Sequence, residues 1–598
     1  MLDIKSSILQ SRWVFPPSND ELIQRMMSDY KIPEIVARLL ASRNIGHEQV
    51  DNYLNPKLAR DFPDPHCLKA MEEFADCVAD EIIKGTKIAA FCDFDVDGST
   101  SAAILKKFFR HIGQDLTVYI PCRMNEGYGP NTKALRQLKD SGHDFVIMAD
   151  CGTNSCEVIE EANSFGLKVC ILDHHEAGDE VAPALHLVNP KRRDCESGLT
   201  MLAACGVTFL ACVAINAKLR VKGFYKDRNL SEPPLKNWLD LVALGTVCDM
   251  VPLTGPNRLF VKVGFEQMAM HNNVGLKALC EVGNIKKTPT SQDAGFILGP
   301  RINAGSRVHK SDLGALLLSC EDEEEAKNLA WLLNDCNTKR RDIQKDMLKD
   351  AVRMVEKNGY QDDPIILVHD ESWHVGLNGL VAGQIKERFG KPACAIAFAV
   401  GMDGRLEGRG SGRSVPGFNM AALFMAAKEA RLVTKGGGHA MAAGFTVYPE
   451  NIPALHEFFK EHAAKIAEQN NFIVEDTVDG IASIRGLRPD FVRLLENNVG
   501  PFGQENPEPK FVLSHVKIVN VDIVGTDHVR LQISDIAGGT RMKAMAFKSA
   551  DTPLGQALLN GRGQNIHLMG QFKVNEWNGT ESIEFHVADA AYALEAAE

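Results

Sequence analysis

The chain has 598 residues, which at the usual size of about 150 residues per domain excludes a single small module and predicts three or four domains. Hydrophobic residues make up 45% of it and charged residues 24%, and this ordinary balance excludes a chain that is mainly disordered. Lys and Arg total 66 against 78 Asp and Glu, a net charge of −12, so any nucleic-acid site must be a local basic patch.

The cysteines and the amino-terminal segment both bear on the cellular compartment. The 15 Cys form no C-x-x-C pair, and their scatter fits neither a zinc ribbon nor a secreted disulfide framework. The first residues lack the basic start and apolar run of a secretory signal, and no stretch reaches the roughly 18 uncharged apolar residues that cross a bilayer. We therefore expect a reducing, cytoplasmic environment.

The first half of the chain predicts an α/β domain behind a helical extension. The extension covers residues 1–84, and from 85 to 275 short apolar strands alternate with amphipathic helices. This alternation predicts right-handed crossovers and a doubly wound parallel sheet that is covered on both faces. Strands are expected at 87–92, 116–121, 144–149 and 167–172.

The second half predicts three further parts. Residues 276–358 form a helical connector, in which 321–358 is typical of one long amphipathic helix, and residues 359–462 form a smaller α/β domain. From 470 to 592, five short strands with turn residues between them predict a small barrel or sandwich. In one of these, residues 528–535, apolar and polar side chains alternate as a strand with one buried face requires.

Acidic side chains follow three of the expected strands at the edge where open parallel sheets bind ligands. One group comes directly after the first strand and just before a helix, and two more groups end later strands. The residues are Asp93, Asp95 and Asp97, then Asp150, and finally Asp173 with His174 and His175. Their repetition at equivalent strand ends favours one shared site.

Clustered carboxylates repel one another and lose hydration, so this arrangement predicts bound divalent metal. Oxygen ligands with one or two imidazoles suit Mn²⁺ or Mg²⁺ better than zinc, and the number of carboxylates favours two ions. Such a pair supports in-line hydrolysis at a phosphoryl group.

Two simpler interpretations compete with the metal site. A calcium loop that starts at Asp93 would need Glu at its twelfth position, which is Ile104, so this interpretation fails. Alone, the Asp-His-His triplet at 173–175 is more typical of a helix cap with two solvent-facing histidines. Together with the other carboxylates, the metal interpretation is favoured.

These motifs resemble the DHH phosphoesterase superfamily, which is named for the triplet at 173–175, and the resemblance assigns residues 85–275 to its catalytic domain. It implies two ions, Mn²⁺ or Mg²⁺, with Asp150 bridging both. The implied metal ligands are Asp93, Asp95, Asp97, Asp150, His174 and Asp249. His175 completes the implied catalytic set, and whether it contacts metal or the scissile phosphate stays open.

The segment GGGHAMAAG at 436–444 is similar to the signature of the DHH-associated domain, here 359–462. Consecutive glycines let backbone N–H groups approach a phosphate closely, and an imidazole can donate to the same oxygens. We therefore expect Gly437, Gly438 and His439 to bind substrate. A simple glycine-rich turn is the alternative, and it is the better interpretation of this segment in isolation.

Within the superfamily, the chain is similar over nearly its whole length to the RecJ family, bacterial exonucleases that degrade single-stranded DNA from the 5′ end. The segments that carry the similarity are RMNEGYGP, GPRINAGSRV, LNDCNTKRRDIQ, HVGLNGLVAGQIKERFGKP, GRGSGRSVPGFN and PFGQENPEP. The resemblance implies two-metal-ion hydrolysis of single-stranded DNA to mononucleotides, in recombination and repair. It also assigns 470–592 to an OB fold that binds single-stranded DNA.

The same resemblance implies the residues that hold the substrate. Residues 401–445 carry an excess of Arg and Lys over Asp and Glu, which meets the need for a local basic patch. The 5′ phosphate is held by Arg123 together with the turn that carries Ser411 and Arg413, because the guanidinium fork suits phosphate oxygens. Tyr128 stacks on a base.

Further along the strand, Arg301 and Asn303 are implied to hold the DNA backbone. In the carboxyl-terminal domain, the candidates for stacking on bases are Phe547, Phe572 and Trp577. For the two phenylalanines, we expect a place in the barrel core.

Two other functions stay open. A small-substrate DHH phosphodiesterase or nanoRNase fits the metal motifs, but the carboxyl-terminal β domain argues against it. A non-catalytic DNA-binding replication scaffold fits the β domain, but the full set of carboxylates argues against it. As partners, the resemblance implies single-stranded DNA, a single-stranded-DNA-binding protein and a RecQ-like helicase. We expect no membrane and a monomer.

Overall fold

A computed structural model describes residues 4–401, 404–469, 474–536, 538–577 and 579–593. The chain divides into two compact units. Unit 1 joins Met1–Asp61 to Phe472–Glu598, and unit 2 is Phe62–Asn471. The grouping of the amino-terminal segment with the carboxyl-terminal one is not foreseen by the sequence analysis, because it depends on contacts between the two ends of the chain.

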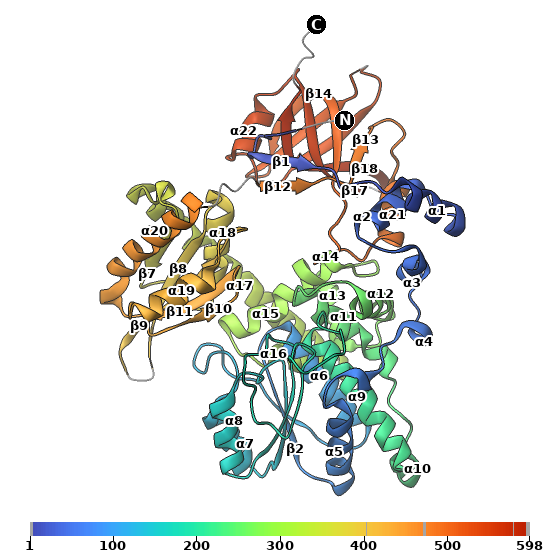
Figure 1. Ribbon diagram of the computed structural model, residues 1–598, viewed down its shortest axis with the longest axis vertical. Coiled ribbons are helices and arrows are strands. Elements are labelled where there is room, and N and C mark those ends of the chain that lie inside the picture. Colours follow the sequence, from blue (N-terminus) through green and yellow to red (C-terminus); the bar gives the residue numbers. More distant parts are fainter. Residues whose placement is uncertain (1–3, 402–403, 470–473, 537, 578, 594–598) are drawn as a thin grey trace. The chain divides into compact units, whose positions relative to one another are not determined.

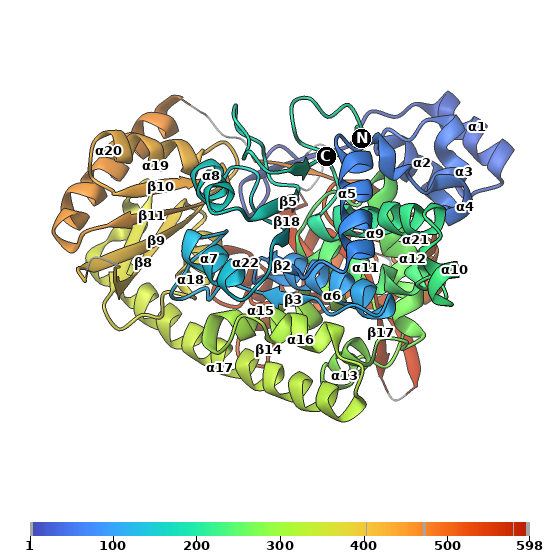
Figure 2. The same cartoon turned by 90° about the horizontal axis from the view of Figure 1, so that it is seen from below.

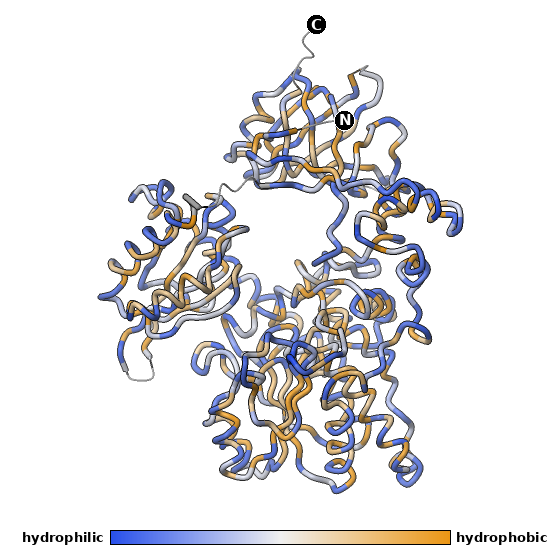
Figure 3. Tube along the Cα trace, viewed as in Figure 1, coloured by the Kyte–Doolittle hydropathy of each residue, from blue (hydrophilic) through white to orange (hydrophobic). Residues whose placement is uncertain are grey.

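Unit 2 contains the expected doubly wound sheet. Five parallel strands lie in the order β3-β2-β4-β5-β6 (Figure 1). The residues of β2, β4 and β5 are nearly all apolar (Figure 3), and nearly all of them are buried. The strands are β2 (Ile88–Cys92), β3 (Thr117–Tyr119), β4 (Phe145–Ala149), β5 (Lys168–Leu172) and β6 (His186–Val188). Four of them are the predicted strands, and β6 adds an edge strand that the sequence analysis missed.

Helices cover both faces of this sheet (Figure 2). α7 (Thr132–Asp140) and α8 (Cys156–Ser164) pack on one face. α5 (Met71–Lys84), α6 (Val96–His111) and α9 (Ala204–Val221) pack with the other. α6 begins at Val96, directly after its N-cap Asp95, so the acidic loop runs into its first turn.

By length and composition, α9 passes the test for a membrane-crossing helix, but 72% of its residues are buried inside the structure. It packs against α5, α6 and α11 (Leu239–Cys248). These contacts make it a core helix of unit 2.

α10 (Phe224–Arg228) and α12 (Gly255–Ala269) complete the residues expected for the first α/β domain. A helical connector follows, with α13 (Val274–Val282), α14 (Ser291–Asp293), the π-helical turn η4 (Ala294–Leu298), α15 (Gly299–Val308), α16 (Leu313–Ser319) and α17 (Glu323–Asn358). α17 confirms the long helix predicted at 321–358. It packs against α13 and α15 near one end and against α18 (Asn378–Phe389) near the other.

The predicted second α/β part is also present. A mixed sheet has the order β10-β11-β9-β8-β7, with α17 and α18 on one face and α19 (Met420–Glu429) and α20 (Ile452–Gln469) on the other. The strands are β7 (Ile366–Asp370), β8 (Ala393–Val400), β9 (Leu406–Arg413), β10 (Lys435–Gly438) and β11 (Ala442–Val447).

The segment that carries Ser411 and Arg413 lies in strand β9, so the expectation of a turn is wrong. Its alternate glycines have a packing reason. A Cβ at Gly410 would lie 2.1 Å from the Phe445 ring, and one at Gly412 would lie 2.6 Å from the ring of Phe424. One face of β9 therefore accepts only glycine, while Ser411 and Arg413 share the opposite face.

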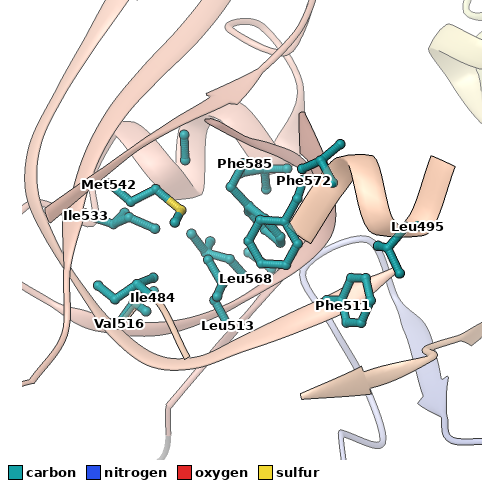
Figure 4. Close-up of a cluster of buried hydrophobic side chains, with 14 of the residues drawn as sticks. Ile484, Leu495, Phe511, Leu513, Val516, Ile533, Met542, Leu568, Phe572 and Phe585 are labelled. Carbon is teal, nitrogen blue, oxygen red and sulfur yellow. The ribbon is translucent and has the colours of Figure 1, made fainter. Parts of the chain in front are cut away.

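Unit 1 is built on a closed five-stranded barrel with the strand order β14-β15-β16-β18-β17 and β17 pairing back to β14 (Figure 1). The strands are β14 (Phe511–Val524), β15 (His528–Ser534), β16 (Arg541–Ala546), β17 (Asn565–Trp577) and β18 (Thr580–Tyr592). α22 (Pro553–Leu559) links β16 to β17, and β13 (Gly480–Ala482) extends the sheet beside β14. Phe511, Phe572 and Phe585 fill the interior (Figure 4).

The amino-terminal segment belongs to the same core. α1 (Asp20–Tyr30), α2 (Glu34–Ser42) and α3 (Val50–Leu54) share one apolar cluster with α21 (Pro489–Asn498) and the barrel, and α4 (Leu58–Asp61) follows. β1 (Ser11–Val14) pairs in parallel with β12 (Val474–Thr477).

A buried carboxylate ties β1 to the barrel. Asp589 is 1% exposed and accepts hydrogen bonds from Ser11 Oγ at 3.1 Å, Trp13 Nε1 at 3.3 Å and the Leu9 backbone N–H at 3.3 Å. A single side chain of β18 thus satisfies three donors of the amino-terminal segment.

Asp589→Ala should therefore destabilise unit 1 by about 3 kcal/mol, because each buried donor left unpaired costs on the order of 1 kcal/mol or more. The measurement is urea unfolding together with hydrogen exchange of residues 11–14. Asp522→Ala, which removes a surface ion pair with Arg530, is the control and should cost less than about 1 kcal/mol. Unchanged exchange in β1 would contradict the role given to Asp589.

Candidate metal centre and phosphate pocket

The acidic loop between β2 and α6 is shaped by a helix cap. Asp95 is the N-cap of α6, and its Oδ1 accepts from the backbone N–H groups of Asp97 at 2.9 Å and Gly98 at 3.1 Å. A Cβ at Gly98 would lie 2.2 Å from the Asp93 carbonyl oxygen, so only glycine lets the loop fold back this closely.

Asp97 is held by the amino terminus of α9. Its Oδ2 accepts from the Ala204 N–H at 2.7 Å and its Oδ1 from the Cys205 N–H at 2.9 Å. The first N–H groups of a helix have no partner within the helix, and the helix dipole favours an anion there. This arrangement explains how a carboxylate that is 1% exposed can sit in the core of unit 2.

The remaining predicted ligands converge on His174. Its Nε2 lies 3.4 Å from Asp150 Oδ1, 3.5 Å from Asp249 Oδ2 and 3.7 Å from Asp97 Oδ2. Asp249 comes to this point from the C-cap of α11. The side chains form three overlapping groups of potential ligand atoms: Asp93 with Asp95 and Asp150, Asp97 with His174 and Asp249, and Asp150 with His174 and His175.

The donor set fits divalent cations. Asp93 Oδ1 and both ring nitrogens of His174 are buried without a hydrogen-bond partner, which is costly unless another group binds them. Burial, and then the neighbouring carboxylates, hold the pKa values of Asp93 and Asp150 well above the usual range and raise the pKa of Asp249 to about 9. Cations would relieve both penalties, and oxygen ligands with an imidazole suit Mn²⁺ or Mg²⁺.

Asp173 plays a different part from the other carboxylates. Its Oδ2 accepts from Thr153 Oγ1 at 2.6 Å, and its Oδ1 accepts from the His174 N–H and from His175 Nδ1, both at 2.8 Å. Burial acts to raise its pKa, but the hydrogen bond and charge of His175 outweigh burial and hold the pKa below its usual value. Asp173 therefore stays ionised and orients the imidazole of His175, whereas it holds only the backbone of His174.

Tyr128 completes this chain of contacts. Its hydroxyl lies 2.9 Å from His175 Nε2, and the two rings meet edge to face with their centroids 5.6 Å apart. With Nδ1 bonded to Asp173, His175 offers Nε2 toward Tyr128 and the cavity. That cavity has a volume of about 590 Å³ and is lined by Tyr128, His175, Gly438 and His439 among others.

A second group of predicted residues gathers around α18. Ser411 Oγ donates to Asn378 Oδ1 at 3.1 Å, and a Cβ at Gly379 would lie 2.9 Å from Arg413 Nη2. The Arg413 side chain thus lies against the first turn of α18. A helix amino terminus beside a hydroxyl and a guanidinium is suited to bind a phosphate.

Arg307 lies beside this group, and the sequence analysis missed it. Its Nη1 donates to the Gly376 carbonyl at 2.7 Å. Burial, and then the charges of Arg123, Arg340 and Arg413, lower its pKa to about 9. Guanidiniums that crowd together in this way favour an anion among them.

Signals for the missed residues were present but weak. Arg307 lies in GPRINAGSRV and Arg340 in LNDCNTKRRDIQ, two of the segments that carried the family resemblance. Arg307 lies near Arg340 and Arg413 only because α15 and α17 pack close to the mixed sheet. No local sequence pattern predicts this packing. Arg301 and Asn303, which were predicted, lie on α15 and are not among the residues that line the cavity.

In unit 1, one of the two expectations for aromatic residues is wrong. Phe572 is 3% exposed in the barrel core, as expected. Phe547 is 49% exposed, because it follows β16 on the outer face, between the rings of His528 at 5.3 Å and His586 at 4.8 Å. The Trp577 side chain lies outside the described residues.

Comparison with known proteins places these parts in one family. The DHH family, N-terminal domain, matches residues 87–246, the DHHA1 domain matches 362–465 and the RecJ OB domain matches 478–589. The Escherichia coli (strain K12) single-stranded-DNA-specific exonuclease RecJ is 33% identical over 93% of this chain and 95% of its own. The chain belongs to the RecJ family.

Other relatives agree. The RecJ of Bacillus subtilis (strain 168), also named as a single-stranded-DNA-specific exonuclease, is 31% identical over 97% of this chain and 71% of its own length. The crystal structure of Thermus thermophilus RecJ in complex with Mn²⁺ matches with a TM-score of 0.78 at 25% identity, over 98% of this chain and 79% of that one. The same protein with Mg²⁺ matches with a TM-score of 0.71. These likenesses support the expected α/β domains and the OB fold.

If the carboxylates hold metal, Mn²⁺ at 100 times its dissociation constant should stabilise unit 2 by about 2.7 kcal/mol. Asp150→Asn should lose most of this gain. The metal-free variant should also be at least as stable as wild type at pH 8, because folding forces the Asp150 carboxyl either to take up a proton or to bury a repelling charge, and an amide requires neither. Thermal unfolding with Mn²⁺ and with EDTA measures both effects.

Asp179→Asn is the matched control, since Asp179 is an exposed acid paired with Arg193. It should keep the full Mn²⁺ gain. An Asp150→Asn variant that still gained stability from Mn²⁺ as wild type does would rule out this carboxylate as a ligand.

Proposed function

We propose that this chain hydrolyses single-stranded DNA from its 5′ end and releases mononucleotides. Membership of the RecJ family makes it a metal-dependent single-stranded-DNA exonuclease. The direction, the product and the residues in each role are the finer proposal. The observation that carries it is a candidate phosphate pocket, formed by Arg123, Arg307 and Arg413 beside the first turn of α18. After burial, the charges of Arg123 and Arg413 lower the pKa of Arg307, and the charge of Arg123 lowers the pKa of Arg413.

A pocket of this kind favours a strand terminus. A 5′-terminal phosphate carries more negative charge than an internal diester, so it gains more from guanidiniums and a helix amino terminus. Arg123 also lies near the metal centre, because its positive charge and the charge of Asp93 favour each other's ionised forms. A terminal phosphate bound beside Arg123 and Arg413 would set the register in which the next phosphate meets the carboxylates.

In the metal centre, the ligands would be Asp93, Asp95, Asp97, Asp150, His174 and Asp249. Two divalent ions bound there would stabilise the attacking and leaving oxygens of an in-line displacement. Hydrolysis forms one bond between phosphorus and a water oxygen and breaks the bond between phosphorus and the 3′ oxygen of the terminal nucleotide. The released nucleotide keeps its 5′ phosphate, and the shortened strand begins with a new one.

The chain's own side chains hold the reacting groups in place. His175, fixed by Asp173, offers Nε2 at the cavity wall for a phosphate oxygen or a proton. Tyr128 presents its ring for stacking on the terminal base. Across the cavity, the hairpin of Gly437, Gly438 and His439 would approach the sugar-phosphate backbone, since Gly438 adopts a φ of 136° that other residues rarely adopt.

The OB barrel of unit 1 would bind further nucleotides of the strand, with the exposed ring of Phe547 as a stacking platform. Arg301 and Asn303 on α15 would hold phosphates. We further propose that the chain acts as a cytoplasmic monomer in DNA recombination and repair, with a single-stranded-DNA-binding protein and a RecQ-like helicase as partners.

Arg413→Ala should abolish the preference for a phosphorylated 5′ end. Wild type should degrade a 5′-phosphorylated oligonucleotide at least tenfold faster, in kcat/KM, than its 5′-hydroxyl counterpart, because a charge-assisted bidentate contact is lost without the phosphate. The variant should degrade both at similar rates. Arg193→Ala, which removes a surface guanidinium that is 74% exposed, should keep the preference.

The assay that tests the function follows single- and double-stranded oligonucleotides labelled at the 5′ or 3′ end. Mononucleotide should appear at once from the 5′ label of single strands, and EDTA or Asp97→Asn should reduce the rate at least a thousandfold, since the carboxylate's charge would be lost from the centre. Release that begins at the 3′ label would refute the proposed direction. Cleavage of dinucleotides alone would favour a small-substrate phosphodiesterase, and binding without cleavage would favour a scaffold.

A further inference from the structure

Phe296 is an apolar ring in an unusual place. It lies in the π-helical turn η4, directly before α15, and 79% of it is exposed. π-helical turns are rare and occur frequently at functional sites. A Cβ at the neighbouring Gly295 would meet nothing within 4 Å, so the surface here is open.

The residue after this ring connects it to a guanidinium. The Ile297 carbonyl accepts a hydrogen bond from Arg301 Nη1 at 2.7 Å, and Arg301 Nε donates to Asn334 Oδ1 on α17 at 3.2 Å. One turn before Asn334, Trp331 presents a second aromatic ring that is 59% exposed. The junction of η4, α15 and α17 therefore combines two exposed rings with a cation.

This cation is one of four on two helices that pack together. Arg301 and Arg307 lie on α15, and Arg340 and Arg341 lie on α17. After burial, the charge of Arg340 lowers the pKa of Arg307, and the charge of Arg341 lowers the pKa values of Arg340 and Arg301. Arg340 is anchored through Asn337 Oδ1 at 2.6 Å and Gln344 Oε1 at 2.7 Å. In the described part of the chain, none of these four guanidiniums forms an ion pair with a carboxylate.

We propose that the guanidiniums of Arg340, Arg341 and Arg301 form a track for the single-stranded DNA backbone and that Phe296 stacks on a base at the end of this track. The proposal rests on the proposed exonuclease function and adds a binding subsite to it. The occupant is a nucleotide of the bound strand several positions from its 5′ terminus, because the track begins at the pocket proposed for the terminal phosphate.

Physical chemistry favours this occupant. Nonspecific single-strand sites combine a row of cations for the backbone with aromatic rings for the bases, because every base offers a stacking face. In an acidic chain of net charge −12, arginines that no described carboxylate neutralises retain their attraction for phosphates. An exposed phenylalanine with no polar edge gains more from stacking on a base than from water.

The test uses the full chain with EDTA, so that binding is measured without cleavage. A series of 5′-phosphorylated 20-nucleotide strands carries 2-aminopurine at successive positions, and stacking quenches its fluorescence. Wild type should quench strongly at one position beyond the first few nucleotides. Phe296→Ala and Phe296→Leu should lose that quenching, and Phe296→Trp should retain it, because tryptophan keeps an aromatic face while leucine keeps only apolar volume.

The kinetic arm uses Mn²⁺ and the same strands. Phe296→Leu should raise KM about tenfold for the 20-nucleotide strand while kcat stays within twofold, and a strand of three nucleotides should show no change. Met270→Ala, at an apolar residue of unit 2 that is 61% exposed, should match wild type in every measurement.

The outcomes separate the two proposals. If Phe296→Leu quenches and degrades the long strand as wild type does, the stacking subsite is refuted while the exonuclease stands. If wild type never degrades DNA, the proposed function fails, and the quenching series still decides whether Phe296 stacks on a bound strand. If Phe296→Leu raised KM equally for the three-nucleotide and the 20-nucleotide strand, the stacking subsite would also be refuted, because the variant would have a general defect in binding.

Discussion

The carboxyl groups of Asp97, Asp150 and Asp249 meet around the imidazole of His174 at the carboxyl edge of a parallel sheet, and the repulsion within this cluster is the constraint on which the rest of the structure depends. Water would hydrate such groups elsewhere, but here Asp93, Asp97 and Asp150 are each at most 2% exposed. The fold therefore supplies backbone donors where it can. The amino terminus of α9 holds Asp97, and the Asp95 cap fixes the loop that carries Asp93. What the backbone leaves unsatisfied is suited to cations.

The neighbourhood of this edge is arranged by charge. Asp173 is occupied by its own hydrogen bonds and orients His175, so its part differs from that of the carboxyl groups around His174. Around α18 the charge is positive instead of negative, because the guanidiniums of Arg123, Arg307 and Arg413 lie near one another. An anionic substrate that spans both sites would neutralise the guanidiniums with one phosphate while the metals receive the next. Electrostatic complementarity thus explains both the position and the direction of attack that we propose.

Glycine shapes the structure where backbones must approach each other. Gly98 lets the acidic loop close on Asp93, and Gly410 and Gly412 let strand β9 pass the rings of Phe445 and Phe424. Because those two glycines face the core, Ser411 between them faces the opposite side of the sheet. The same glycine-rich pattern that suggested a turn from sequence alone is therefore a strand whose packing leaves no room for a side chain.

The sequence by itself determined the parallel sheet, the long helix, the barrel strands and the metal motif. These follow from local periodicity, and the carboxyl ends of parallel strands share one edge by geometry, so Asp93, Asp150 and His174 could be brought together without coordinates. The roles of these residues as ligands remain a prediction. Only the tertiary structure decided that Met1–Asp61 joins the barrel unit, that Phe547 is exposed and that Arg307 lies near the guanidiniums of Arg123 and Arg413. Each of these depends on elements that are distant in sequence and meet only in the fold, where burial and charge are set by neighbours that no local pattern specifies.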